Sequence, residues 1–375
     1  MLKNGVVIVI NPMVKKYAEV LVNYSLDVKK DDEVLIQGNL LSEPLVKAIY
    51  RQIILNGGHP TVMTQFEGQE EIFYKNASEE QLNYQSPFQK YLYENVDARI
   101  YIIANYNTRA LSNIDSEKIK KRQLANRELK EIFMKRAAEG KLNWNICQYP
   151  TLADAQEARM SLEEYEDFVF QACHLGENDP VKYWQEFGAE LQGYANFLEE
   201  VDKLHFRSED TDLTCRVDGR SWVADMGKEN YPGGEVFTGP VENSVEGHIR
   251  FSFPGIYQGK EIEDIRLTFE KGKVIKASAG KGEELLQTLL ETDEGASYVG
   301  EVAVGCNKGI THFSRNMLFD EKIGGTIHLA IGRSYPETGG KNISSIHWDM
   351  LCDMKDGGTI YADGERIYEN GEFLI

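Results

Sequence analysis

The chain has 375 residues, of which 42% are apolar and 27% charged, enough for a large buried core and for more than one domain. Its 41 basic and 60 acidic residues give a formal net charge of -19, which repels phosphate backbones and anionic lipid headgroups. Composition therefore argues against a nucleic-acid partner and against a membrane partner, and it favours two domains.

The cysteines favour a reducing compartment. All 5 are scattered without any C-x-x-C spacing, so neither a disulfide framework nor a zinc-thiolate site is predicted. The apolar run from Val6 to Ile10 is broken by Asn11-Pro12 and is too short for a signal peptide. No stretch approaches the roughly 20 apolar residues of a membrane span. We therefore expect a cytoplasmic protein.

The first half of the chain predicts a parallel sheet, because apolar runs typical of buried strands alternate with helical patterns. Strands are expected at 33–37, 61–64, 97–104 and 144–147, and helices at 13–27, 43–55 and 114–139. This order is typical of an α/β, Rossmann-like sheet with helices on both faces. The turn after the first strand, Gly38-Asn39-Leu40-Leu41, lacks a G-x-G-x-x-G fingerprint, so nucleotide binding is not expected.

The second half has a different pattern. Residues 161–203 have helical periodicity, with Ser161 and Glu164 placed as a capping box, and this stretch is expected to connect two domains. Short alternating strands and glycine turns follow, including a hairpin signal at Glu270-Lys271-Gly272-Lys273. We therefore predict an α/β N-terminal domain with its helical connector at 1–185 and a mostly antiparallel β (α+β) catalytic domain at 186–375.

Potential metal ligands occupy apolar, glycine-flanked runs of this second half. Glu235, Glu301 and His328 each lie singly in a run that is typical of a buried strand. His347 and Asp349 point to the same face if their segment is extended, because side chains alternate along a strand. A buried, unpaired charge is unfavourable and requires a partner. A metal ion is the partner that suits this mixture of imidazoles and carboxylates.

The charges of these candidates suit a site with two metal ions. Three carboxylates, two neutral imidazoles and two divalent cations together leave a net charge of about +1, which would lower the pKa of a water between the ions. Each residue taken alone is more simply a strand-edge carboxylate or a hydrogen-bonded core histidine, and no short motif such as H-E-x-x-H is present. Their co-occurrence in apolar strands is what favours metal binding.

Other candidates carry less weight. His312 is either a substrate-side residue or an ordinary loop histidine, and Cys306 is best explained as a small buried filler. Among the remaining histidines, His59 is expected at the start of a strand and His248 on a solvated strand face. His174 and His205 are expected in the helical connector.

Four segments of the second half carry a resemblance. They are Gly234-Glu235-Val236-Phe237-Thr238-Gly239-Pro240, Gly300-Glu301-Val302-Ala303, Gly324-Gly325-Thr326-Ile327-His328-Leu329-Ala330 with Tyr335-Pro336 following, and His347-Trp348-Asp349-Met350. Together they resemble the thermophilic aminopeptidase family of metallopeptidases, the group that contains aminopeptidase S and aminopeptidase T. The similarity extends over essentially the whole chain.

The resemblance implies a role for each matching residue. The metal ligands would be Glu235, Glu301, His328, His347 and Asp349, and the active-site tyrosine would be Tyr335. The resemblance also implies a homodimer whose sites face an enclosed space, with peptides that have a free N-terminus as substrates.

We therefore expect a dinuclear aminopeptidase that removes N-terminal residues from peptides by metal-activated water. Its cofactors would be two divalent metal ions per subunit, zinc or cobalt, with magnesium and manganese as alternatives. Glu301 or Glu235, if it is not fully engaged with metal, would carry a proton to the leaving amine, and Tyr335 would donate to the oxyanion or complete the metal shell. Glu242 is a candidate for binding the substrate amine. The alternatives are a metal-dependent deacylase and a non-catalytic protein that binds peptides or stores metal.

Overall fold

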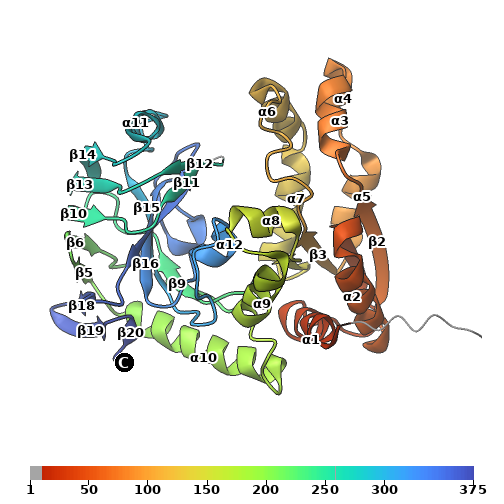
Figure 1. Cartoon of the computed structure of the whole chain (residues 1–375), viewed down its shortest axis with the longest axis horizontal. Coiled ribbons are helices and arrows are strands. Elements are labelled where there is room, and N and C mark those ends of the chain that lie inside the picture. Colours follow the sequence, from red (N-terminus) through yellow and green to blue (C-terminus); the bar gives the residue numbers. More distant parts are fainter. Residues whose placement is uncertain (1–10, 258) are drawn as a thin grey trace, which may run out of the picture. The chain divides into compact units, whose positions relative to one another are not determined.

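The structure, a computed structural model, describes residues 11–257 and 259–375, so the apolar run from Val6 to Ile10 lies outside the described residues. The chain forms two compact units (Figure 1). The first comprises Met1–Tyr183 and Lys228–Tyr231, and the second comprises Trp184–Gly227 and Pro232–Ile375. Among the described helices we find none that is both long enough and apolar enough to span a bilayer.

The first unit contains the predicted parallel sheet. Its strand order is β2-β1-β3-β4-β8, and all neighbouring strands are parallel. The strands are β1 (Glu33–Asn39), β2 (His59–Gln65), β3 (Ala98–Ile103), β4 (Asn143–Gln148) and β8 (Asn230–Tyr231). The α/β, Rossmann-like prediction is confirmed. Strand β8 comes from a segment that the sequence pattern placed in the second half.

Helices cover both faces of this sheet. They are α1 (Pro12–Val20) with a π-helical turn at Leu21–Ser25, α2 (Glu43–Leu55), α3 (Gln69–Asn76), α4 (Glu79–Asn83), α5 (Pro87–Asn95), α6 (Ser116–Ala125), α7 (Arg127–Ala138), α8 (Leu152–Glu157) and α9 (Leu162–Ala172), with a 3-10 turn at Leu40–Ser42. Leu35 of β1 packs with Leu92 of α5 and Phe133 of α7, while its buried neighbours Val34 and Ile36 point to the opposite face.

The prediction of a single helix at 114–139 is wrong, because the structure divides this segment into two helices, α6 and α7, at Asn126.

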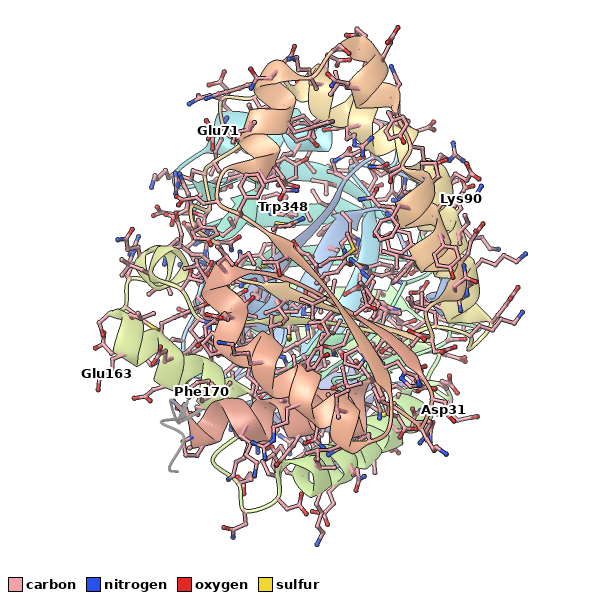
Figure 2. All side chains as sticks on the ribbon, turned by 90° about the vertical axis from the view of Figure 1, so that its right-hand side faces the viewer. Asp31, Glu71, Lys90, Glu163, Phe170 and Trp348 are labelled. Atoms are coloured by element: carbon pink, nitrogen blue, oxygen red, sulfur yellow. The ribbon has the colours of Figure 1, made fainter. Side chains whose placement is uncertain are left out.

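The capping box of α9 forms as predicted, with the Ser161 hydroxyl accepting from the Glu164 amide. Acidic and basic side chains such as Glu71 and Lys90 project outward from their helices (Figure 2). These helices thus present a charged surface to the solvent.

The second unit contains two antiparallel sheets and a short ribbon. Their strand orders are β14-β13-β10-β6-β5-β18-β19-β20, β17-β16-β15-β9-β7 and β11-β12. The strands are β5 (Lys203–Ser208), β6 (Thr211–Arg216), β7 (Val223–Asp225), β9 (Glu235–Thr238), β10 (Glu246–Arg250), β11 (Gly255–Tyr257), β12 (Lys260–Ile262), β13 (Arg266–Glu270), β14 (Lys273–Ser278), β15 (Val299–Gly305), β16 (Thr326–Gly332), β17 (His347–Asp353), β18 (Thr359–Ala362), β19 (Glu365–Glu369) and β20 (Glu372–Phe373). The antiparallel β prediction is confirmed, including the hairpin between β13 and β14.

Helices are fewer among the described residues of this unit. They are the part of α10 (Pro180–Leu198) that follows Tyr183, α11 (Glu283–Leu290) and α12 (Met317–Asp320), with a 3-10 turn at Pro336–Thr338. Leu191, Ala195 and Leu198 of α10 belong to the main hydrophobic core of the unit.

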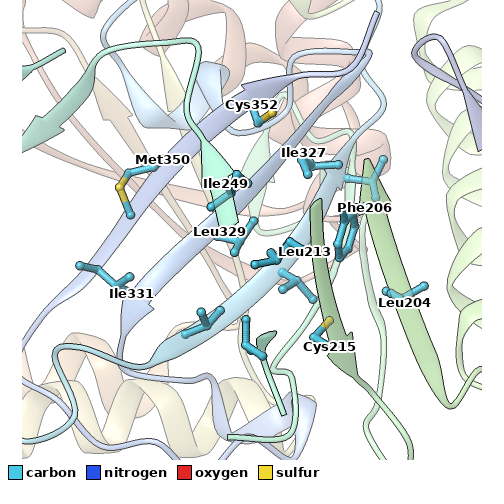
Figure 3. Close-up of a cluster of buried hydrophobic side chains, with 14 of the residues drawn as sticks. Leu204, Phe206, Leu213, Cys215, Ile249, Ile327, Leu329, Ile331, Met350 and Cys352 are labelled. Atoms are coloured by element: carbon cyan, nitrogen blue, oxygen red, sulfur yellow. The ribbon is translucent and has the colours of Figure 1, made fainter. Parts of the chain in front are cut away.

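That core contains side chains from both antiparallel sheets (Figure 3). The labelled members from the larger sheet are Leu204, Phe206, Leu213, Cys215 and Ile249, and those from the smaller sheet are Ile327, Leu329, Ile331, Met350 and Cys352. All are almost completely buried. Because side chains alternate along each strand, His328, which lies between Ile327 and Leu329, must point to the other face of the smaller sheet. The same holds for His347 and Asp349, which flank the core residue Trp348 in β17.

Gly300 permits an irregularity that helps to place Glu301. The pairing of β15 with β16 shifts register between Val299 and Glu301. A Cβ atom on Gly300 would lie 2.4 Å from the carbonyl oxygen of Arg333, closer than real Cβ contacts come. The position therefore requires glycine.

We predict that Gly300→Ala destabilises the protein by about 2 kcal/mol, because the added methyl group displaces the backbone at Arg333. Urea unfolding measures this change. Gly193→Ala is the matched control, since Gly193 is exposed in α10 with open space around its Cα, and alanine should stabilise that helix by up to about 1 kcal/mol. Equal stability of Gly300→Ala and the wild type would contradict the close approach.

Candidate metal centre

One face of the smaller sheet collects the predicted metal ligands. Glu301 of β15 pairs across the ladder with Ala330 of β16, which in turn pairs with Asp349 of β17. Glu235 of β9 pairs with Gly305 at the other end of β15. Cross-strand partners share a face, so adjacent strands bring together residues that are far apart in the sequence.

The predicted ligands form a continuous row of alternating carboxylates and imidazoles. His328 Nε2 lies 3.4 Å from Glu235 Oε2 and 3.0 Å from Glu301 Oε1. His347 Nε2 lies 3.8 Å from Glu301 Oε2 and 3.4 Å from Asp349 Oδ1. Glu301 therefore stands in the middle, with one oxygen facing each histidine. The structure brings together every residue that the sequence placed in the metal site.

The row is buried at one end and accessible at the other. The side chains of Glu235, Glu301 and His328 are 7%, 6% and 1% exposed, whereas those of His347 and Asp349 are 21% and 12% exposed. A ligand or water can therefore reach the site from the side of His347 and Asp349.

The donor atoms fit a divalent metal ion. Within the described part of the chain, Glu235 Oε2, Glu301 Oε2, Asp349 Oδ1 and His328 Nδ1 are buried without a hydrogen-bond partner. Ligand atoms of Glu301, His347 and Asp349 all lie within 4.8 Å of one another. Imidazole nitrogens and carboxylate oxygens are the ligands of catalytic zinc and related metals. Converging carboxylate oxygens that lack donors are best neutralised by a cation.

The backbone sets the orientation of His347. Its Nδ1 donates to the carbonyl oxygen of Arg333 at 2.7 Å, so Nε2 is left to face Glu301 and Asp349. This arrangement fixes the tautomer that presents a lone pair to a metal. The Arg333 carbonyl is the group that Gly300 leaves room for.

Burial and mutual charge shift the pKa values of these groups. Burial raises the pKa of Glu235 and of Glu301. Burial acts to lower the pKa of the histidines, but the neighbouring carboxylates outweigh it and raise the pKa of His328 to about 9 and of His347 to about 10. Burial likewise opposes ionisation of Asp349, yet His347 holds its pKa below the usual range. Without a metal ion, protons on the histidines thus supply the compensating charge.

Tyr335 lies beside this row, in the loop that follows β16. Its ring centroid is 4.8 Å from that of His347 and 5.8 Å from that of Phe237. The residue is 40% exposed. Burial, together with the nearby charges of Glu301 and Asp349, raises the pKa of the phenol, so it remains a proton donor at neutral pH.

Sequence reasoning missed Lys322, whose side chain is 0% exposed. Its ammonium lies 3.5 Å from Glu235 Oε1, 3.5 Å from Asp225 Oδ2 and in contact with Glu321. These carboxylates raise the pKa of Lys322 although burial opposes the charge. In the sequence, Asp320-Glu321-Lys322 has the composition of a solvated helix end, so only tertiary packing reveals the buried cation.

Several weaker candidates lie outside the row. His312 is on an exposed loop with its Nδ1 2.9 Å from the Thr311 hydroxyl. His205 was expected in the helical connector, and this is wrong, because it lies in β5 and contacts Asp212 at 2.7 Å. Cys306 is half-buried, and burial raises the pKa of its thiol, which disfavours a nucleophilic role.

Glu242, the candidate for binding the substrate amine, is already engaged. Its Oε2 accepts from the Arg220 guanidinium at 2.7 Å, and its Oε1 accepts from the Lys341 amide at 2.6 Å. Both carboxylate oxygens thus have partners within the protein, which argues against this role.

Asp293 fastens the segment that leads into β17. Its carboxylate accepts from the Ser344 hydroxyl at 2.8 Å and from the amide and hydroxyl of Ser345 at 2.7 Å each. These hydrogen bonds lower the pKa of Asp293 to about 2. Because Ser345 is close to His347 in the chain, Asp293 helps to hold the start of the strand that carries two predicted ligands.

We predict that Asp293→Asn lowers the stability of the metal-free protein at pH 7 by about 1 kcal/mol, a value that allows for solvent screening. A lowered carboxyl pKa stabilises the fold above the unfolded-state pKa, and this contribution is lost as pH falls from about 4 to about 2. The difference between the variant and the wild type should therefore shrink over that range in urea unfolding. Glu294→Gln, a change at the exposed neighbour, is the control. A pH-independent difference would contradict the assignment.

We predict that Lys322→Met destabilises the metal-free protein by about 3 kcal/mol, because it leaves buried carboxylates without their cation. Lys308→Met, which removes an exposed ion pair with Glu372, should change stability by less than about 0.5 kcal/mol. Denaturant unfolding of both variants measures the contrast. Similar stability of the two variants would show that Lys322 does not neutralise the buried end of the row.

Comparison with known proteins identifies the family of this chain. The family model described as "Thermophilic metalloprotease (M29)" matches residues 10–373. Aminopeptidase AmpS of Bacillus subtilis is 29% identical, with 96% of this chain and 98% of that protein covered. Aminopeptidase T of Thermus thermophilus is 28% identical with the same coverage.

Solved structures give the same result. The structure of wild-type AmpT from Thermus thermophilus superimposes with a TM-score of 0.83 at 25% identity, covering 97% of this chain and 99% of that one. A 2,5-dihydroxypyridine dioxygenase from Pseudomonas putida has a TM-score of 0.59 at 14% identity over 96% of each chain, a likeness of fold alone. The extent of the family match shows that this chain belongs to the thermophilic metalloprotease family.

Proposed function

We propose that this metallo-aminopeptidase holds two divalent metal ions and uses them to remove N-terminal residues from peptides. The proposed ligands are Glu235, Glu301, His328, His347 and Asp349. The observation that carries the proposal is the position of Glu301, whose Oε1 faces His328 at 3.0 Å and whose Oε2 faces His347 at 3.8 Å. This position is suitable for a carboxylate that would be shared between two metal ions.

The donor set favours zinc or cobalt. Two imidazoles are unusual for magnesium, which prefers oxygen ligands and retains several waters, so magnesium and manganese are secondary candidates. When bound, the ions polarise the peptide carbonyl and lower the pKa of water. The proton carrier to the leaving amine is proposed to be Glu301 if one of its oxygens stays free of metal, and otherwise Glu235, since both carboxylates lie within the row.

Tyr335 is proposed to donate its phenolic proton to the oxyanion that forms on the attacked carbonyl. Its raised pKa keeps the donor protonated, and its partial exposure beside His347 leaves it accessible to a substrate. A single donor of this kind contributes about 100- to 1,000-fold in rate in other hydrolases.

The proposal extends to the surroundings of the enzyme. A homodimer and peptide substrates with free N-termini are inferred from the family resemblance. A cytoplasmic location is supported by the cysteine thiols, which form no disulfide within the described part of the chain, since a reducing compartment keeps thiols reduced.

We predict that excess chelator abolishes hydrolysis of leucyl-anilide and that zinc or cobalt restores it. The same preparation should hydrolyse a peptide with a free N-terminus and leave its N-acetylated counterpart intact, because an aminopeptidase requires the free amine. A deacylase, by contrast, would accept the blocked peptide. Rates are measured with metal-free protein and each of zinc, cobalt, manganese and magnesium. Full activity in excess chelator would contradict the proposed metal-dependent mechanism.

We predict that Asp349→Ala lowers kcat/KM by at least about 100-fold, since loss of even an outer-shell partner of a metal ligand costs about 10- to 100-fold. The variant should also bind less metal, as measured by elemental analysis after dialysis. Asp353→Asn is the control, because Asp353 lies further along β17 and pairs with Lys355. Unchanged metal content in Asp349→Ala would remove Asp349 from the proposed ligands.

A further inference from the structure

The loop between β16 and β17 carries Tyr335, and it is held by hydrogen bonds within itself. The Ser334 amide donates to the Asn342 carbonyl at 3.0 Å, which closes the loop at its base. The Thr338 hydroxyl and amide both donate to the Tyr335 carbonyl, at 2.7 Å and 3.2 Å. The backbone of Tyr335 is therefore tied to the 3-10 turn that follows it.

A partly buried ion pair, formed by residues outside this loop, binds the loop backbone. The guanidinium of Arg220 donates through Nη1 to the Gly339 carbonyl and through Nη2 to Glu242 Oε2 at 2.7 Å. The other oxygen of Glu242 accepts from the Lys341 amide at 2.6 Å. Arg220 and Glu242 thus hold two loop residues on either side of Gly340.

The Arg220 and Glu242 side chains are largely shielded from solvent, which strengthens their interaction. The side chain of Arg220 is 6% exposed and that of Glu242 is 28% exposed. Burial alone would favour the neutral form of Glu242, but backbone amides and Arg220 hold its pKa below the usual range. Ser221, the neighbour of Arg220 in the chain, connects this region to the sheet and to the loop. Its carbonyl accepts from the Thr238 hydroxyl of β9, and its amide donates to the Thr338 carbonyl.

The side chain of Tyr335 has less support of its own. The residue is 40% exposed, and the ring centroids of its neighbours Phe237 and His347 lie 5.8 Å and 4.8 Å from that of Tyr335. The position of the phenol therefore depends on the loop backbone, and the loop backbone depends on its external anchors. Small displacements matter in such a site, since a shift of about 1 Å can lower a rate about 100-fold.

We propose that Arg220 and Glu242 form a positioning pair that holds the Tyr335 loop in its reactive arrangement. This inference rests on the proposed role of Tyr335 as a proton donor. It assigns Glu242 a function that explains why both of its oxygens are engaged, in place of the amine-binding role expected from the sequence.

The test is a double-mutant cycle on kcat with leucyl-anilide, using Arg220→Gln and Tyr335→Phe in the metal-loaded full-length protein. Arg220→Gln alone should lower kcat by about 10-fold and change KM by less than about 2-fold, because it acts through a group that serves the transition state. In the Tyr335→Phe background the same substitution should change kcat by less than about 2-fold. Glu242→Gln should behave in the same way, and it carries the test if Arg220→Gln fails to fold.

The matched control is Arg216→Gln, which removes the same charge from an exposed pair with Asp218 near the same segment and should leave kcat unchanged within about 2-fold. Equal effects of Arg220→Gln in both backgrounds, or no effect in either, would overturn the positioning pair. Wild-type activity in Tyr335→Phe would instead overturn the proposed role of Tyr335, and the inference with it. The two failures are therefore distinguishable.

Discussion

Negative charge buried on one face of a β-sheet is the constraint on which the rest of this molecule depends. Glu235 and Glu301 are 5% exposed, and Asp349 completes the row beside them. Such charges are unfavourable in a protein interior unless a cation is close by. Lys322 compensates one end of the row, and protonated histidines or a bound metal ion compensate the remainder. A metal-dependent enzyme gains its metal affinity from this otherwise unfavourable arrangement.

The scaffold fixes this row through both faces of one sheet. Ile327, Leu329 and Ile331 direct their side chains into the apolar core, so His328 between them must face the opposite way. Beyond the sheet, three backbone or ionic anchors hold the groups at the edge of the row. They are the Arg333 carbonyl on His347, the Asp293 carboxylate on the segment before β17, and the proposed Arg220 and Glu242 pair on the Tyr335 loop. Precision in the site thus comes from residues that do not themselves belong to the row.

Local sequence patterns predicted much of this arrangement. The alternation of strands and helices predicted the parallel sheet, and alternation within strands placed His347 and Asp349 on one face, which the register confirms. Other features depend on contacts between distant segments and have no local signal. Strand β8 has only two residues, too few for a periodic pattern, and Lys322 lies in a run of charged residues that resembles a solvated helix end. Glu242 was assigned from its sequence neighbourhood, whereas its partner Arg220 comes from a separate segment.

The most direct test of the proposed two-metal centre is a stoichiometric titration. Metal-free protein, at a concentration well above the dissociation constants, receives zinc or cobalt in small steps while leucyl-anilide hydrolysis is followed. If Glu301 is shared between two ions, activity should continue to rise until two metal equivalents per chain have been added. Full activity at one equivalent per chain would contradict the shared-carboxylate account.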